Sequence, residues 1–398
     1  MTQHSFFKRK LLRFSTDLTW REFKKTAGYD VLMNYCQDGS TDDPVVLFPD
    51  LSPEAGLPTG SVFVSKEHFY PFGVGVDIGC GYTYAGIRNS KIDFNALVNI
   101  EVDLKQKAMD WKRASDVVQA ILLGNRPMEY PHSTNQVNLY NDKRIPTSIA
   151  NYLSPKALEW LGVLSPGNHF IEIHRVEQLR NGIMGEVKYI CIVHNGSSIV
   201  GAVLDALLLQ AWRDRPNELK QISRLSEYHP VNTLFWSIKE AAVQYAQLQR
   251  HKMIEWVCDM LDVDFFYLGD NTHTDIIRTP RGFVHYSGVS QVTSSEQILF
   301  LAGSVGSKSQ LISVQEPTKT INGISHGTGS AFSSYELADG LISGITTNLD
   351  PVNLAELNKQ YRGVDIASGV LIKNDLINIV ADLYPVFVYK RGEKLANL

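Results

Sequence analysis

Hydrophobic residues recur at helical spacing in two long stretches of the chain. Residues 93–123 carry an amphipathic pattern in pieces, which predicts short helices. In residues 233–261 the apolar side chains on one helical face are Phe235, Ile238, Ala242, Tyr245 and Leu248. The second stretch therefore predicts a long helix with one buried face.

Shorter apolar runs bounded by glycine and proline predict strands. These runs occupy residues 62–81, where turns interrupt them, 169–176 and 187–194. After Asn271 the pattern is again strand and loop, until a C-terminal helix predicted over 374–383. Helices and strands do not alternate regularly, so we expect a mixed α+β fold with sheets flanked by helices.

Composition narrows the class of protein without naming a function. Of the 398 residues, 44% are hydrophobic and 20% charged, which is typical of a globular chain rather than a disordered one. No apolar run approaches the ~18 residues of a membrane span, and the N-terminal segment lacks the pattern of a secretory signal. We therefore expect no membrane partner and one domain over residues 1–398, with its motifs between about 45 and 392.

The net charge of the chain does not indicate a binding partner, whereas its cysteine content indicates a cellular compartment. The formal net charge is −4, so bulk charge does not announce a nucleic-acid partner, although a local basic groove stays possible. The four cysteines form no CxxC pair: Cys36, Cys80, Cys191 and Cys258. So few cysteines in so long a chain predict a reducing compartment and a cytoplasmic protein.

Four short segments place metal-binding side chains next to glycine, asparagine or serine. Asp77 and Cys80 stand three residues apart in GVGVDIGCG, and a thiolate can bridge two divalent cations while a carboxylate binds one of them. Three histidines stand near strand ends or in a polar loop: His169, His194 and His273. Imidazoles at such positions can point into a shared cleft.

Each of these residues alone has a simpler interpretation. A single histidine at a strand end is more often a hydrogen-bonded polar residue than a ligand, and a single free cysteine is usually buried filler. The segment GSVGSK is not a Walker phosphate loop, because its glycines and lysine do not have the GxxxxGK spacing. The joint pattern is what favours a metal site.

In this order, the segments resemble the motifs of the RtcB family of RNA ligases from about Pro49 to Lys390. PDLSPEAGLPTG resembles the family's PDVHxGYGxPIGG, VGVDIGCG is nearly identical, and SPGNHFIEI matches GxGNHFxEI. Looser matches are VHNGSSIVG, NTHTDI, FVHYSGV, LAGSVGSKSQL, ISHGTGS and LYPVFVYKRG. The resemblance implies a single RtcB-like catalytic domain that uses GTP and manganese.

The resemblance also implies a role for each matching residue. Cys80 would bridge two Mn²⁺ ions, Asp77 and His169 would complete one site, and His194 and His273 the other. His326 would be the nucleophile that takes GMP from GTP. The GTP-binding residues would be Asn168 near the triphosphate, Glu172 at the guanine, Gly303, Ser304, Ser309, Gly327 and Gly329 in the pocket, and Lys390 at the guanine or ribose.

Several basic or polar residues of the family motifs are replaced in this chain. The substitutes are Ser52, Ser198, Tyr286, Ser287 and Ser330. Arginine and lysine at such positions would contact phosphate, so their loss should weaken the hold on RNA ends or on the triphosphate. The predicted metal ligands and the nucleophile are all retained.

The resemblance favours an RNA ligase that joins a 3′-phosphate or 2′,3′-cyclic phosphate to a 5′-hydroxyl through a guanylylated histidine and an RNA-ppG intermediate. The alternatives are a divergent paralogue serving a narrow RNA repair substrate, a two-metal phosphoesterase and a non-catalytic RNA-binding subunit. The motifs do not indicate whether the protein needs an activating partner protein.

Some residues near the motifs carry weaker predictions. Tyr245 and Arg250 fit a family-like helix motif, but they fit packing and surface positions equally well. His174 and His285 are expected to form local hydrogen bonds, and Cys36, Cys191 and Cys258 to be structural filler.

Overall fold

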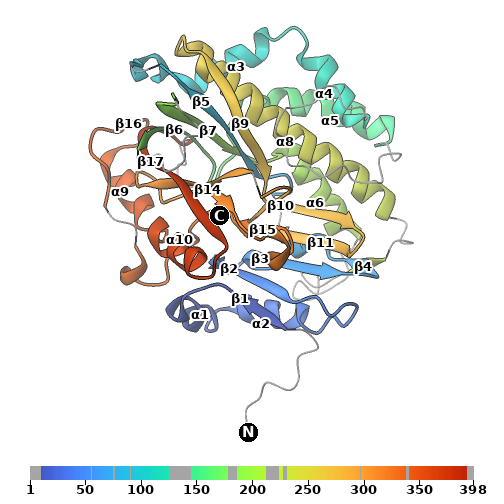
Figure 1. Ribbon diagram of the computed structural model, residues 1–398. Helices are drawn as coiled ribbons and strands as arrows, with labels where there is room; N and C mark the ends of the chain where they lie inside the picture. The colour runs from blue at the N-terminus through green and yellow to red at the C-terminus, as the bar shows by residue number, and fades with distance from the viewer. Residues whose placement is uncertain are drawn as a thin grey trace.

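Two β-sheets carry the fold in the computed structural model of the protein (Figure 1). The described residues are 10–54, 56–74, 77–89, 91–124, 145–177, 186–211, 224–226, 231–295, 297–337 and 340–391. Gly75 and Val76 of the GVGVDIGCG motif lie outside them. With helices beside these sheets, the predicted mixed α+β fold is confirmed.

The larger sheet has the strand order β13-β14-β17-β6-β7-β5-β9, and β16 pairs with β17. Its strands are β5 (Gly81–Ile87), β6 (Phe170–Glu177), β7 (Tyr189–Asn195), β9 (Phe265–Thr272), β13 (Ile298–Leu301), β14 (Ser309–Val314), β16 (Thr346–Thr347) and β17 (Ile377–Tyr389). Strands β6 and β7 are the runs predicted at 169–176 and 187–194. The first five residues of β6 and the last six of β7 are buried, as continuous apolar runs predict.

The smaller sheet has the order β1-β2-β3-β11-β10. Its strands are β1 (Leu11–Arg13), β2 (Val45–Ser52), β3 (Thr59–Ser65), β10 (Thr274–Thr279) and β11 (Gly282–Ser287). Two short pairs complete the strands: β4 (His68–Phe69) with β8 (Leu225–Ser226), and β12 (Val289–Gln291) with β15 (Gly323–Ser325). The chain passes from the larger sheet to the smaller one between β9 and β10, through a single residue, His273.

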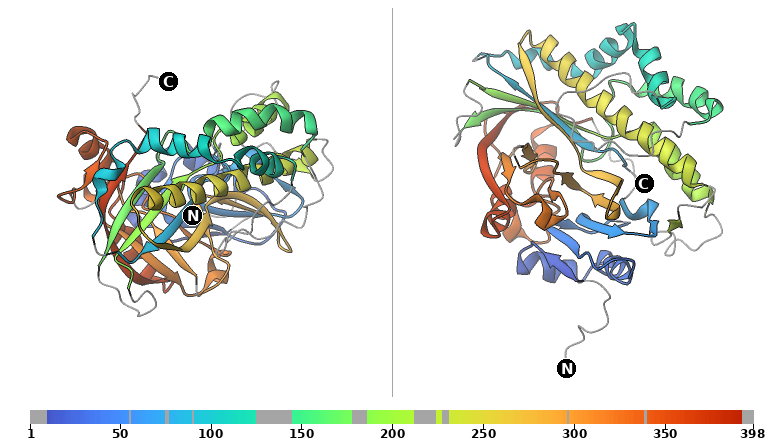
Figure 2. Two further views of the ribbon diagram at one scale, coloured as in Figure 1. Left: turned by 90° about the horizontal axis from the view of Figure 1, so that it is seen from above. Right: turned by 45° about the vertical axis from the view of Figure 1, so that its right-hand side comes forward.

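Helices cover the larger sheet on the side of β5, β7 and β9 (Figures 1 and 2). They are α3 (Ile100–Asp110), α4 (Ala114–Leu122), α5 (Thr147–Trp160), α6 (Ile199–Ala211) and α8 (Asn232–Met260). Helices α3 and α4, which follow a 3₁₀ turn at Phe94–Leu97, confirm the short helices predicted over 93–123, and α8 confirms the long one. Helices α1 (Asp17–Phe23) and α2 (Ala27–Tyr35) lie below the smaller sheet in Figure 1.

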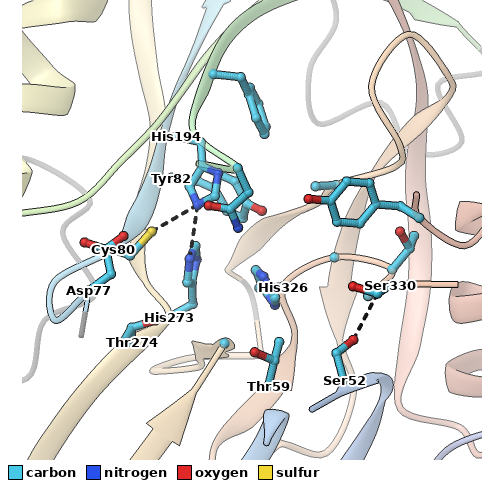
Figure 3. Close-up of a pocket in the computed structure, with 18 of the residues that line it drawn as sticks. Ser52, Thr59, Asp77, Cys80, Tyr82, His194, His273, Thr274, His326 and Ser330 are labelled. Carbon is cyan, nitrogen blue, oxygen red and sulfur yellow. Dashed lines mark hydrogen bonds between the residues drawn. The ribbon is translucent and has the colours of Figure 1, made fainter. Parts of the chain in front are cut away.

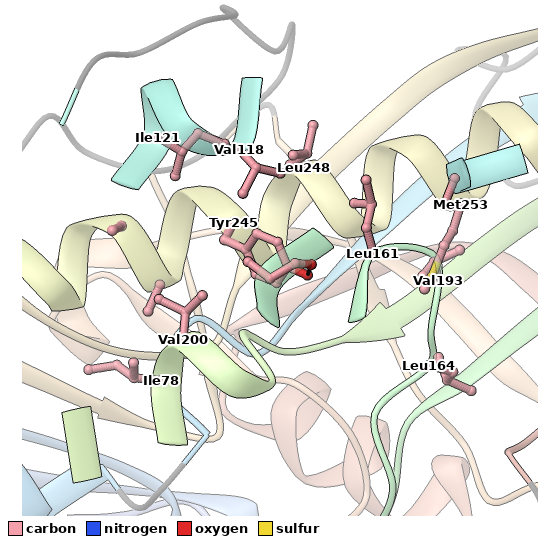
Figure 4. Close-up of a cluster of buried hydrophobic side chains, with 14 of the residues drawn as sticks. Ile78, Val118, Ile121, Leu161, Leu164, Val193, Val200, Tyr245, Leu248 and Met253 are labelled. Carbon is pink, nitrogen blue, oxygen red and sulfur yellow. Dashed lines mark hydrogen bonds between the residues drawn. The ribbon is translucent and has the colours of Figure 1, made fainter. Parts of the chain in front are cut away.

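The apolar face of α8 forms the centre of the largest core cluster (Figure 4). Tyr245 and Leu248 on α8 pack with Val118 and Ile121 of α4, and the Tyr245 hydroxyl donates a hydrogen bond of 2.6 Å to the Ala157 carbonyl. A buried phenol must find such a partner, because an unpaired hydroxyl would lose its hydrogen bonds to water. This packing fixes α8 behind strands β5 and β7, whose ends carry the predicted site.

The predicted C-terminal helix over 374–383 is wrong. Residues 377–383 instead form the first part of β17, which pairs with β14 on one side and β6 on the other. Two helices precede it that the sequence pattern did not predict: α9 (Pro351–Asn358) and α10 (Val364–Lys373). The β-branched Ile377, Ile379 and Val380 favour a strand, and pairing along both edges overrides any helical spacing. Among the described residues, the structure contains no helix long and apolar enough to cross a membrane.

Candidate active site

A cavity of about 390 Å³ is lined by residues from both sheets and from the loops that join them. Figure 3 shows Asp77, Cys80, His194 and His273 at one end and Ser52, Thr59 and Ser330 at the other. His326 lies between the two groups. The cavity therefore brings together residues that are far apart in the chain; Ser52 and Ser330, for example, are 278 positions apart.

The five predicted metal ligands form one continuous cluster. The Cys80 Sγ atom lies 3.3 Å from Nε2 of His169 and 3.1 Å from Nε2 of His194. The Asp77 Oδ2 atom lies 2.9 Å from Nε2 of His169, and Nε2 of His194 lies 3.3 Å from Nε2 of His273. The donor atoms of Cys80, His169 and His194 all lie within 4.8 Å of one another. Sulfur and imidazole nitrogen form a donor set suited to a transition-metal ion.

The backbone holds these side chains at the ends of strands. Asp77 and Cys80 belong to the turn that leads into β5, where Gly79 has a φ of +86°. A side chain at Gly79 would also meet the backbone of α8 at Val243, 3.0 Å from its Cβ position. Glycine is therefore required both by the left-handed conformation and by the close approach of the helix.

His273 differs from its predicted setting. It was expected in a polar loop, but it is the single residue between β9 and β10 and is only 2% exposed. Its backbone N–H donates to the Cys80 carbonyl at 2.9 Å, and its carbonyl accepts from the Val289 N–H at 2.8 Å. These bonds tie His273 to the turn that carries Cys80, so strand pairing rather than a loop sets its position.

Burial alters the protonation of this cluster. Burial and the neighbouring histidines hold the pKa values of His194 and His273 well below the usual range of imidazole. Burial, reinforced by the Asp77 carboxylate, raises the pKa of the Cys80 thiol well above its ordinary value. Metal ligands must be neutral imidazoles and deprotonated thiols. The two histidines already meet that requirement, and a bound cation would supply the positive charge that a Cys80 thiolate needs.

His326 forms a pair with a carboxylate that the sequence interpretation missed. The Asp50 Oδ2 atom accepts hydrogen bonds from Nδ1 of His326 at 2.7 Å and from its backbone N–H at 3.3 Å. Asp50 is fully buried, and His326 is 9% exposed at the cavity. The His326 ring centroid is 4.5 Å from that of His273. Asp50 belongs to the PDLS motif, so the motif itself carried a signal for this residue.

Six of the predicted GTP-binding residues line the cavity: Asn168, Glu172, Gly303, Gly327, Gly329 and Lys390. Glu172 also accepts a hydrogen bond of 2.8 Å from His174. The Lys390 Nζ atom donates to the carbonyls of Gly167 and His169 at 3.1 and 3.0 Å. Lys390 therefore ties the final strand to the loop that carries Asn168 and His169.

The two predicted serines of this group do not line the cavity. The Ser304 hydroxyl donates to the Asn358 carbonyl at 2.7 Å, and the Ser309 hydroxyl accepts from the Gly303 N–H at 2.9 Å. Both are buried. Their hydroxyls hold the loop that brings Gly303 to the cavity.

The residues that replace family motif residues are divided between the cavity and the core. Ser52, Ser287 and Ser330 line the cavity, and the Ser330 N–H donates to the Ser52 hydroxyl at 2.9 Å. Tyr286 lies in the core and donates to the Ile321 carbonyl at 3.1 Å. Ser198 precedes α6 with a φ of +51°.

Some of the weaker predictions agree with the structure and others do not. Arg250 is fully buried, so the surface interpretation of this residue is wrong; it pairs with Asp270 behind the cluster. His174 bonds locally to Glu172, as expected, whereas His285 bonds to the backbone of Tyr70 and Phe63, 215 and 222 positions away. The three other cysteines are buried, which agrees with structural filler: Cys36, Cys191 and Cys258.

Comparison with known proteins identifies the family. The family model described as tRNA-splicing ligase RtcB matches residues 32–273, more than half of the chain. The chain belongs to the RtcB family.

Two curated relatives of this family member are similar over long stretches. An RNA-splicing ligase RtcB2 from Escherichia coli is 23% identical over 372 residues, which cover 87% of this chain and 88% of the relative. A tRNA-splicing ligase RtcB from Thermococcus kodakarensis is 23% identical over 268 residues, 58% of this chain and 55% of the relative. The family match includes all five residues of the metal-ligand cluster but ends before His326.

Proposed function

We propose that this RtcB family member is a GTP- and manganese-dependent RNA ligase. It joins an RNA 3′-phosphate or 2′,3′-cyclic phosphate end to a 5′-hydroxyl end. The observation that carries the proposal is the position of His326 in the same cavity as the metal-ligand cluster, with its ring 4.5 Å from that of His273. A nucleophile next to paired cations is the arrangement that phosphoryl transfer requires.

The cluster would hold two Mn²⁺ ions, with Cys80 shared between them. The contacts run in the order Asp77, His169, Cys80, His194, His273, with Cys80 in the middle. This order supports Asp77 and His169 on one ion and His194 and His273 on the other. When bound, the ions would neutralise the oxygens of the reacting phosphates.

His326 would act through its Nε2 atom. Because Asp50 accepts the hydrogen bond from Nδ1, the tautomer with a proton on Nδ1 is favoured and the lone pair lies on Nε2. That lone pair attacks the α-phosphorus of GTP, a P–N bond forms, and the P–O bond to pyrophosphate breaks. An oxygen of the RNA 3′-phosphate then displaces His326, giving an RNA-ppG end, and the 5′-hydroxyl finally displaces GMP.

GTP would lie in the part of the cavity lined by Asn168, Glu172 and Lys390. A carboxylate accepts hydrogen bonds from the N–H groups of guanine, whereas the ring nitrogen N1 of adenine offers no donor. The backbone at Gly303, Gly327 and Gly329 would approach the phosphates, and Ser304 and Ser309 would shape that loop. We infer that residues 1–398 act as one catalytic domain; a cytoplasmic location stays a prediction.

A divergent enzyme with a narrow RNA substrate is the second candidate. Uncharged Ser52, Ser287 and Ser330 stand in the cavity where family motifs carry histidine or basic residues, so fewer charges would hold RNA phosphates. Such an enzyme would still transfer GMP to His326.

The test uses the purified protein with Mn²⁺, GTP and two RNA substrates, a broken tRNA-like stem and an unstructured pair of ends. Joining of 3′-phosphate to 5′-hydroxyl ends that requires both GTP and Mn²⁺ is expected for the ligase. Labelling of the protein by GTP with joining of only one substrate would favour the narrow enzyme. Phosphate release without GTP would contradict both and indicate a phosphoesterase.

A further inference from the structure

We infer that Glu54 is a catalytic residue of the sealing step, in which it takes the proton from the attacking 5′-hydroxyl. This inference rests on the proposed ligase function and names the part of the cavity that receives the second RNA end. The RtcB motif carries glycine at this position, so the carboxylate is a feature of this chain. Glu54 follows β2, which ends at Ser52, and it lines the same cavity as His326.

Hydrogen bonding and packing place Glu54 close to the reacting histidine. Its Oε1 atom accepts from the Thr59 hydroxyl at 3.1 Å. A Cβ at Gly288 would lie 2.6 Å from the Thr59 side chain and 3.1 Å from Cε1 of His326. Thr59 and His326 thus both lie against Gly288, at the space that a side chain there would fill. Figure 3 shows Thr59 beside His326, on the side away from Cys80.

The wall around Glu54 suits a hydroxyl better than a phosphate. The same cavity is also lined by the hydroxyl residues Ser52, Ser330 and Tyr361. Among the described lining residues, Lys390 is the one lysine or arginine, and it donates to the carbonyls of Gly167 and His169. A carboxylate repels a phosphate but accepts a hydrogen bond from an alcohol.

Arg362 does not supply the missing charge at this wall. It is 1% exposed, and its guanidinium donates to the backbone carbonyls of Pro49, Leu51 and Thr328. Arg362 therefore stabilises the backbone next to the cavity from its buried side. The end that enters here is the one with a free hydroxyl and no terminal phosphate.

The proton transfer balances in this arrangement. The 5′-oxygen forms a bond to the 3′-phosphorus of RNA-ppG, the bond from that phosphorus to the bridging oxygen breaks, and GMP leaves with the electron pair. The Glu54 carboxylate takes the hydroxyl proton and later returns it to water. Desolvation of the carboxylate by the surrounding protein raises the pKa of Glu54, although the residue as a whole is exposed to solvent; the Thr59 hydroxyl and His326 lower it. A raised pKa makes a carboxylate a stronger base for this task, and the exposed surface lets the proton pass on to water.

The test isolates the sealing step with a synthetic RNA that already bears a 3′-ppG end. Glu54→Gln keeps an oxygen that can accept from Thr59 but removes the base. We expect sealing to fall about 10²–10⁴-fold, the usual contribution of a general base. The fold-decrease in guanylylation of His326 should be at least ten times smaller than the fold-decrease in sealing. Glu54→Asp, which keeps a carboxylate on a shorter side chain, should lie between wild type and Glu54→Gln.

Glu67→Gln is the matched control, because Glu67 is an exposed carboxylate between β3 and β4 that does not line the cavity. It should seal at the wild-type rate. Sealing by Glu54→Gln within threefold of wild type would overturn the role of Glu54 while leaving the ligase proposal intact. A wild-type protein that neither takes label from GTP nor seals the synthetic RNA would overturn both.

Discussion

Replacing Arg250 by methionine should reduce the free energy of unfolding by about 3–5 kcal/mol, the cost of removing one partner of a buried ion pair. The Arg250 and Asp270 side chains are both fully buried, and the guanidinium bonds both carboxylate oxygens at 3.1 Å. It also donates to the carbonyls of Gly79 at 2.9 Å and Asn195 at 3.1 Å. The variant leaves a buried carboxylate and two buried carbonyls without this donor.

The same change should weaken metal binding. Gly79 precedes Cys80, and Asn195 follows His194, so the two carbonyls that Arg250 holds are next to two predicted ligands. Released carbonyls allow the turn and the strand end to separate. We therefore expect a lower manganese content in Arg250→Met even where the protein is still folded.

Equilibrium urea unfolding measures the first effect. Arg175→Met is the control: its partner Glu177 lies on the surface, with side-chain exposures of 55% and 39%, and such a pair contributes about 0–1 kcal/mol. The double variant Arg250→Met with Asp270→Leu should regain part of the lost stability, because no unpaired charge remains. A loss below about 1 kcal/mol in Arg250→Met would refute the reasoning.

Three further predictions concern the cavity. Asp50→Asn should slow guanylylation about 10²-fold or more, because an amide N–H directed at Nδ1 of His326 favours the wrong tautomer; labelling rates measure this. Cys80→Ala should lose both metal ions, whereas Asp77→Ala should lose mainly one; the manganese content of the purified variants decides this. Glu172→Gln should reduce the preference for GTP over ATP, measured as protein labelling by each nucleotide.

Each of these predictions has a distinct contradiction. Labelling of Asp50→Asn at the wild-type rate, with normal manganese content, would remove Asp50 from the positioning of His326. Near-normal manganese in Cys80→Ala would exclude the bridging role. Equal labelling of the wild-type protein by GTP and ATP would show that Glu172 does not select the base.

Local patterns predicted the helices and strands that lie next to the site. Strands β6 and β7 follow from continuous apolar runs, and α8 from a helical face that includes Tyr245. Strand β17 was missed because it is stabilised by pairing with β14 and β6, which are distant in sequence. A local pattern does not contain that information.

Some features of the candidate site could likewise be predicted from the sequence, and others could not. Motif resemblance singled out Cys80 and His194, and the structure brings their side chains within 3.1 Å. The contact of Asp50 with His326 spans 276 positions, so no spacing rule could predict it. The sequence also could not show that the Ser304 hydroxyl bonds to the Asn358 carbonyl and does not line the cavity, because only the fold brings Asn358 near Ser304.

Labelling with GTP that carries a radioactive α-phosphate tests the central claim most directly. Wild-type protein with Mn²⁺ should become covalently labelled, and the label should be lost in acid and stable in base, as a phosphoramidate is. His326→Ala should take no label while still binding manganese, because His326 is not among the predicted metal ligands. Label that persists in His326→Ala would place the nucleophile elsewhere and contradict the account.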